Sequence, residues 1–166
     1  MNVLVSCDDT SFYYKFWPHV KEIWAERLGI TAKLILITED EQGDAFEDDV
    51  LRVAQAKGFP LHLQTQLARI YYASYFPDTI CLLSDIDMFP VSRSFFDKDE
   101  ISRHCDKDTF FHLNPERREF GQLPICYYCG FGSLYKKLYE NLTWKEFLEI
   151  VVTLNFDTGL LHYKLP

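Results

Sequence analysis

The stretch TICLLSDID at residues 79–87 decides the fold class of this chain. Residues 79–84 form an almost unbroken apolar run, and they follow a segment with helical periodicity. A continuous apolar run after a helix is typical of a central parallel strand, which is buried on both faces. Asp85 and Asp87 therefore follow the carboxyl end of such a strand, where α/β sheets collect their ligands.

The segments before this strand build two β-α-β units. Four of them carry the periodicity of regular structure, namely strands at residues 2–7, 32–37 and 50–53 and a helix at residues 63–76. A further helix runs from the capping side chains at residues 8–11 to Gly29, and Pro18 breaks or restarts it. An acidic loop separates the second strand from the third.

Regularity is weaker beyond Pro90. The charged stretch at residues 97–108 has the composition of a solvated loop. The remaining predicted elements are strands at residues 110–113 and 124–129 and helices at residues 133–139 and 144–152. The whole predicts an α/β fold, with one domain at residues 1–166 built on a mixed β-sheet flanked by helices.

Charge and composition argue against some classes of protein. The net charge of -8 argues against a nucleic-acid binder, because that function needs a basic stripe. No apolar stretch is long enough for a membrane span, and no signal peptide is visible, so we expect a soluble, cytoplasmic protein.

The chain has five cysteines, and this odd number fits a reducing compartment. Cys126 and Cys129 have the spacing of half a metal site, but no second metal-binding pair accompanies them. We therefore interpret this pair as structural.

Asp-x-Asp occurs three times, beginning at Asp85, Asp97 and Asp106, and only the first follows a buried strand. In an extended backbone Asp85 and Asp87 point to the same side, so both carboxylates can face one cation. Oxygen ligands favour Mg²⁺ or Mn²⁺, which keep open positions for water and phosphate oxygens. The alternative is a purely structural role in capping the following turn.

The sequence resembles the GT-A glycosyltransferases, especially the family of glycogenin and the bacterial galactosyltransferases. Three segments carry the resemblance: LSDIDMFP at residues 83–90, the opening at residues 3–13 with SCDDT at 6–10, and QLARI at residues 66–70. Their order and spacing along the first ninety or so residues agree with that family. The resemblance implies a Rossmann-like GT-A domain, short or truncated at its C-terminus.

What the resemblance implies for the site is a metal ion, a nucleotide-sugar donor and an acceptor. The metal ligands would be Asp85, Asp87 and His162, and the ion Mn²⁺ or Mg²⁺. The residues binding the nucleotide or donor would be Ser6, Asp8, Asp9, Thr10, Arg69, Asp85 and Gly130. Asp157 and Arg69 would act in catalysis. The donor favoured is a uridine diphosphate sugar, and the acceptor is a glycan or another hydroxyl compound.

Departures from the family keep other interpretations open. Small residues around Gly130 match its donor-sugar strand only loosely, and the chain ends four residues after His162. Asp8 to Ser11 also suits a simple helix cap, Arg69 a structural ion pair, and Asp157 a loop or cap residue. Alternative functions are a haloacid-dehalogenase-type phosphatase, a nucleotidyltransferase, or a non-catalytic nucleotide-sugar binding domain.

Overall fold

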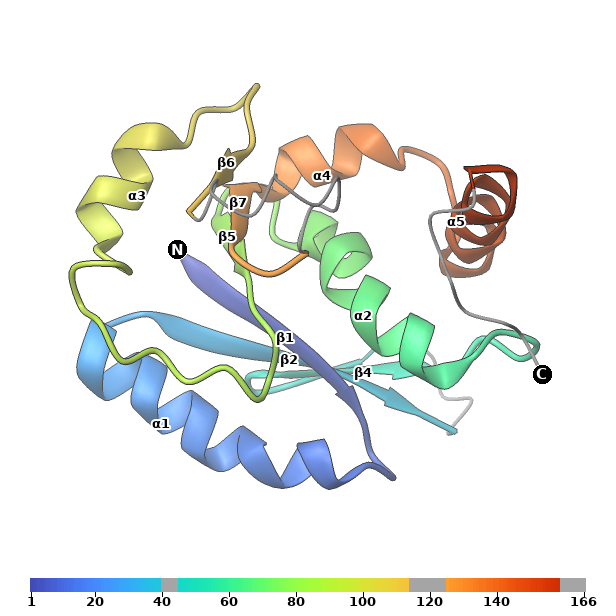
Figure 1. Cartoon of the computed structure of the whole chain (residues 1–166), viewed down its shortest axis with the longest axis horizontal. Helices are drawn as coiled ribbons and strands as arrows, with labels where there is room; N and C mark the ends of the chain where they lie inside the picture. Colours follow the sequence, from blue (N-terminus) through green and yellow to red (C-terminus); the bar gives the residue numbers. More distant parts are fainter. Residues whose placement is uncertain (40–44, 114–124, 159–166) are drawn as a thin grey trace.

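A computed structural model describes residues 1–39, 45–113 and 125–158 of the chain; for Ala45 and residues 155–158 it describes the backbone alone. The fold is mixed α/β, with a seven-stranded sheet between layers of helices (Figure 1). This architecture confirms the fold class predicted from the buried strand and its β-α-β neighbours.

Four strands of the sheet are parallel and three are antiparallel to their neighbours. The parallel strands are β1 (Asn2–Asp8), β2 (Thr31–Thr38), β4 (Val50–Ala54) and β5 (Ile80–Leu83). The antiparallel strands are β3 (Ala45–Glu47), β6 (Phe111–His112) and β7 (Tyr128–Phe131). The order across the sheet is β3-β4-β2-β1-β5-β7-β6, so the direction of strand addition reverses between β1 and β5.

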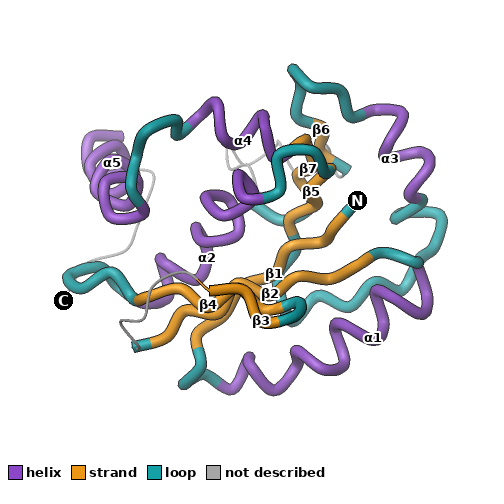
Figure 2. Tube along the Cα trace, turned by 180° about the vertical axis from the view of Figure 1, so that it is seen from behind, coloured by secondary structure: helices purple, strands orange, loops and turns teal. Residues whose placement is uncertain are grey.

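The two main helices cover opposite faces of the sheet (Figures 1 and 2). Helix α1 (Trp17–Leu28) follows the 3₁₀ turn η1 (Phe12–Phe16), with Pro18 in its first turn, and α2 (Leu61–Tyr71) continues into η2 (Tyr72–Tyr75). The other helices are α3 (Lys98–His104), α4 (Gly132–Leu138) and α5 (Trp144–Thr158). Among the described helices none has both the length and the apolar content to cross a membrane.

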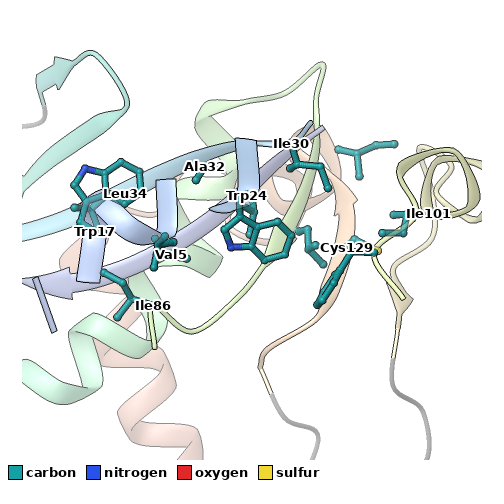
Figure 3. Close-up of a cluster of buried hydrophobic side chains, with 14 of the residues drawn as sticks. Val5, Trp17, Trp24, Ile30, Ala32, Leu34, Ile86, Ile101 and Cys129 are labelled. Atoms are coloured by element: carbon teal, nitrogen blue, oxygen red, sulfur yellow. The ribbon is translucent and has the colours of Figure 1, made fainter. Parts of the chain in front are cut away.

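Alternating residues of the central strand divide the core between the two faces. Val3 and Val5 pack with Trp24 on the α1 side (Figure 3), while Leu4 packs with Tyr72 on the α2 side. All five side chains are at most 1% exposed. Burying each one contributes roughly 1.5–3 kcal/mol, so the central strands are anchored from both directions.

The stretch at residues 97–108 is not the continuous solvated loop expected from its charge. It contains α3, whose N-cap Asp97 accepts a hydrogen bond from the Glu100 amide at 2.8 Å. One apolar residue of this helix, Ile101, is 2% exposed and joins the core on the α1 side. A single buried position in seven residues creates no detectable periodicity, which explains the error.

Candidate functional site

The carboxyl ends of β1 and β5 lie at the point where the strand order reverses, which is where open α/β sheets bind ligands. The Ser84 amide donates to the Leu4 carbonyl at 3.0 Å, so the segment after β5 begins alongside the middle of β1. From Leu4, β1 continues four residues to Asp8, a length of roughly 13 Å at about 3.3 Å per residue. The candidate site therefore has two separate ends, one at Asp85 and one at Asp8.

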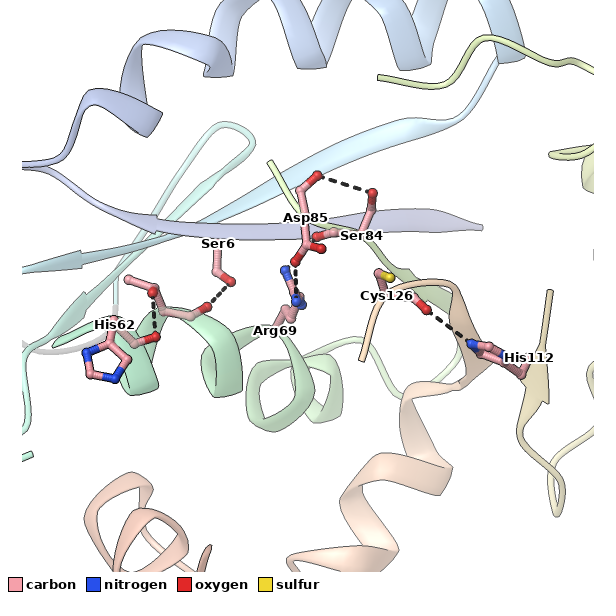
Figure 4. A network of polar contacts seen from close by, with 8 residues as sticks. Ser6, His62, Arg69, Ser84, Asp85, His112 and Cys126 are labelled. Atoms are coloured by element: carbon pink, nitrogen blue, oxygen red, sulfur yellow. Dashed lines mark hydrogen bonds and ion pairs between the residues drawn. The ribbon is translucent and has the colours of Figure 1, made fainter. Parts of the chain in front are cut away.

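Arg69 is the central side chain at the Asp85 end (Figure 4). It lies in the last turn of α2 and is only 4% exposed. Its Nη1 donates to the Ser84 carbonyl at 2.9 Å, and its Nη2 forms an ion pair with Asp85 Oδ1. A planar guanidinium is suited to two such contacts at once, so Arg69 fixes both the carbonyl and the carboxylate. Its Nε is buried and has no hydrogen-bond partner among the described residues.

The segment carrying both aspartates is a turn rather than the extended backbone that we predicted. Strand β5 ends at Leu83, and the Met88 amide donates to the Asp85 carbonyl at 3.2 Å. Ile86, between the two aspartates, is 4% exposed and packs into the core on the α1 side. Asp87 is exposed, and no described residue forms a hydrogen bond or ion pair with its carboxylate. The strand ends early because Asp85 begins this turn.

This donor set fits a hard divalent cation that arrives with its own oxygen ligands. Asp85 and Asp87 offer only carboxylate oxygens, which suit Mg²⁺ or Mn²⁺. Arg69 already balances the charge of Asp85, so the three side chains together carry one net negative charge. The described residues contain no group of three or more His, Cys, Asp or Glu side chains able to hold a metal. We therefore expect weak cation binding that phosphate oxygens strengthen.

The loop after β1 is shaped by its own side chains. Asp8 Oδ1 accepts hydrogen bonds from the Thr10 amide at 3.1 Å and the Thr10 hydroxyl at 2.6 Å. The Ser11 hydroxyl donates to the Asp8 carbonyl at 3.2 Å, and Asp9 is exposed. Ser6 lies deeper, is 5% exposed, and donates its hydroxyl to the Thr65 carbonyl of α2. Ser6 thus joins β1 to α2, while Asp8 and Thr10 hold the loop in one conformation.

Four aromatic side chains link the two ends of the site, and we call them the aromatic ridge: Phe12, Tyr13, Phe16 and Phe89. The Phe16 ring centre lies 5.3 Å from that of Phe12 and 5.9 Å from that of Phe89. Phe12 is 65% exposed, Tyr13 48% and Phe89 36%. Exposed flat rings near the strand ends provide a surface on which a planar base or a sugar ring can stack.

Tyr127 also belongs to the site, although nothing in the sequence singled it out. Its amide donates to the Leu83 carbonyl at 2.6 Å, which places it next to the end of β5. Its φ of 68° is unusual for a bulky residue, and such backbone strain concentrates at functional sites. Burial raises the pKa of its hydroxyl, and nearby Cys126, Asp85 and Asp87 raise it further. The hydroxyl therefore stays protonated, while the ring packs against Phe95 and Phe96, with ring centres 5.7 and 5.4 Å away.

The other predicted site residues lie elsewhere or lack a described side chain. Gly130 pairs with Cys81 in the middle of β7, and a Cβ atom there would lie 2.8 Å from the Phe110 ring. Packing against Phe110 thus accounts for the glycine. Asp157 falls in the last turn of α5, but its side chain is not described, and His162 lies outside the described residues.

The two-pronged contact of Arg69 leads to a testable prediction. In Arg69→Lys the ammonium can pair with Asp85 or donate to Ser84, and the loss of one charge-assisted bond should weaken nucleotide and Mn²⁺ binding by roughly 10-fold or more. Calorimetric titration measures this change. Arg93→Lys is the control, since Arg93 is exposed and has no described ion-pair partner. Unchanged affinity in Arg69→Lys would show that the second contact is dispensable.

No protein-family model matches this chain, and a search of curated proteins also finds no match.

Proposed function

We propose that this protein is a metal-dependent glycosyltransferase of the GT-A type, with a Rossmann-like fold, which moves a sugar from a nucleoside diphosphate sugar to a hydroxyl acceptor. The observation that carries the proposal is the turn after β5, where buried Arg69 holds Asp85 while Asp87 is left exposed. This turn lies beside β1 at the reversal of strand order, the position that suits a nucleotide. The short motifs shared with GT-A enzymes agree with this assignment.

The separation of the two ends supports an extended donor. A nucleoside has a planar base, which the aromatic ridge can stack, and ribose hydroxyls, which Asp9 can accept at the end of β1. The diphosphate then extends along β1 toward Asp85 and Asp87. The resemblance to GT-A enzymes favours uridine diphosphate sugars as donors. It favours glycans or other hydroxyl compounds as acceptors.

Sugar transfer places growing negative charge on the diphosphate leaving group. When bound, Mn²⁺ or Mg²⁺ would act as a Lewis acid on the phosphate oxygens, held by Asp85 and Asp87. Arg69 keeps Asp85 in one orientation and adds a fixed positive charge beside the two carboxylates. Asp157 stays our candidate for the acidic residue near the acceptor, and His162 for a third metal ligand.

The residue after the motif disfavours the phosphatase alternative. A haloacid-dehalogenase-type enzyme places Thr or Val two residues after the second aspartate, where this chain has Phe89. The contact of Arg69 with Oδ1 of Asp85 does not separate the two functions, because it leaves Oδ2 free for a nucleophilic attack or for a cation. Release of inorganic phosphate from simple phosphomonoesters would nevertheless restore that alternative, and it is measured in the same assays.

A thermal-shift screen of nucleoside diphosphates and nucleotide sugars, each with and without Mn²⁺, tests the proposal. A ligand at 100 times its Kd stabilises the fold by about 2.7 kcal/mol, so a binding nucleotide is readily detected. We expect binding that requires Mn²⁺, together with slow hydrolysis of the bound donor. Binding without hydrolysis or transfer would favour a non-catalytic nucleotide-sugar binding domain. No binding to any nucleotide would refute the glycosyltransferase assignment.

A further inference from the structure

Two buried thiols meet at a place that the proposed function does not use. The sulfur atoms of Cys105 and Cys129 are 3.5 Å apart, although the residues are 24 positions apart in sequence. Cys105 is the C-cap residue of α3, and Cys129 lies in β7. Both side chains belong to the core cluster on the α1 side. Figure 3 shows Cys129 and Ile101 of α3 in this cluster. The structure describes all five cysteines of the chain, and none of them forms a disulfide bond.

The two thiols have different chemical surroundings. Cys105 Sγ contacts Cys129 Sγ, and Cys129 Sγ donates to the Phe111 carbonyl at 3.3 Å. In the neutral pair Cys105 Sγ is the donor and Cys129 Sγ the acceptor. If Cys105 ionises, the Cys129 thiol can turn its single proton from the Phe111 carbonyl to the Cys105 thiolate; this contact lowers the pKa of Cys105 and, together with burial, raises that of Cys129. Cys105 is 8% exposed whereas Cys129 is fully buried. Cys105 is therefore the thiol that ionises first and the one that a reagent reaches first.

We propose that Cys105 and Cys129 are a dithiol–disulfide couple, oxidised by a low-molecular-weight disulfide such as oxidised glutathione. The Cys105 thiolate attacks one sulfur of the oxidised glutathione, forms a mixed disulfide and releases one glutathione thiolate. The Cys129 sulfur then attacks the Cys105 sulfur, loses its proton and releases the second glutathione. The protein loses two hydrogens and two electrons pass to glutathione, so the exchange balances.

The geometry requires only a local movement. A disulfide needs a sulfur separation of about 2 Å, so the two atoms must approach by about 1.5 Å. Cys105 sits where the seven-residue helix α3 ends, and its backbone leaves the helix in an extended conformation. A rotation of the Cys105 side chain with a small shift of this end can supply the movement. The paired strand β7 holds Cys129 in place.

The neighbouring cysteines are poorer partners. Burial raises the pKa of both Cys7 and Cys81 to about 12, so neither forms a thiolate near neutral pH. Cys126 and Cys129 have Cys-x-x-Cys spacing, so the sequence alone makes Cys126 a possible partner of Cys129. The sulfur of Cys129 contacts that of Cys105 instead, although the two residues lie in elements that are distant in sequence. Oxidation therefore joins the end of α3 to β7.

The experiment incubates the folded protein in glutathione buffers of increasing oxidation, quenches with acid, and alkylates the remaining thiols in denaturant. Intact mass should change from five alkylated cysteines to three, with the loss of two hydrogens. Chymotrypsin cuts after Tyr127 and Tyr128, which separates Cys126 from Cys129. Mapping should then find Cys105 linked to Cys129.

Two variants and a second readout complete the test. Cys126→Ser should still form the bond, while Cys105→Ser should keep all of its remaining thiols alkylatable. The disulfide should raise the Tm of the wild type by roughly 5–10 °C over the reduced form, because it restricts the unfolded chain, and Cys105→Ser should show no such shift. Five alkylated cysteines in every buffer would overturn the proposal. A mapped bond between Cys126 and Cys129 would overturn it equally.

Discussion

Asp87→Ala is expected to remove the Mn²⁺ dependence of nucleotide binding and to lower donor hydrolysis or transfer on the order of 10²- to 10³-fold. The Asp87 carboxylate is exposed and has no partner among the described residues, so its negative charge is free to face a cation. For the same reason the free energy of unfolding should change by no more than about 0.5 kcal/mol. Calorimetry with Mn²⁺ and nucleoside diphosphate, followed by donor hydrolysis, measures both effects.

The matched control for this prediction is Asp99→Ala. Asp99 lies in the first turn of α3, is exposed, and has no described side-chain partner for its carboxylate. It serves better than Asp97, which caps α3, or Asp106, which accepts two backbone hydrogen bonds at 2.7 and 2.8 Å. Wild-type hydrolysis and metal dependence in Asp87→Ala, with Asp99→Ala unchanged, would remove Asp87 from the site.

Gly132→Ala is expected to lower the free energy of unfolding by about 3 kcal/mol or more, which is a larger loss than that expected for Gly29→Ala. A Cβ atom at this position would lie 2.2 Å from the Phe76 carbonyl oxygen and 2.5 Å from that of Ala73. Both are backbone atoms, so no side-chain rotation relieves the clash. The Gly132 amide also donates to the Thr79 carbonyl at 3.0 Å, which holds the two backbones together.

Thermal unfolding should show this change as a fall in Tm of roughly 10 °C for a chain of this size. Gly29→Ala is the comparison, since no atom lies within 4 Å of the Cβ position and only its φ of 63° opposes a side chain. That variant should lose about 1 kcal/mol. Equal losses in the two proteins would contradict the close approach of α4 to the end of η2.

The central strands were predictable because their apolar runs are long and local. The apolar runs predict strands at residues 2–7, 32–37 and 79–84, and the observed β1, β2 and β5 cover nearly the same positions. Strand β3 was missed because three residues in an antiparallel pair leave no periodic signal. The predicted strand at residues 124–129 is wrong in its bounds, because residues 125–127 form a turn and β7 spans Tyr128–Phe131.

The candidate site was only partly accessible from the sequence. The sequence points to Arg69 because a helix precedes one buried strand, and to Asp85 and Asp87 because a short motif follows that strand. The ion pair between Arg69 and Asp85 is the contact that the sequence left open as the alternative to donor binding, and the role of Arg69 toward a donor stays a prediction. The turn at Asp85 and the position of Tyr127 depend on contacts between distant segments, such as the bond from the Tyr127 amide to Leu83. Local patterns carry no information about such contacts.

The place of β1 in the middle of the sheet has a consequence for how the chain acquires its structure. β1 precedes the other described strands in the chain, yet Asn2 pairs with Thr31 on one side and with Cys81 on the other. One edge of β1 must therefore wait for β5, and contacts so distant in sequence slow folding. The carboxyl ends of β1 and β5 come together only at that late step. We expect a refolding intermediate with β1 and β2 paired to be unable to bind nucleotide, and binding ability to mark the docking of β5.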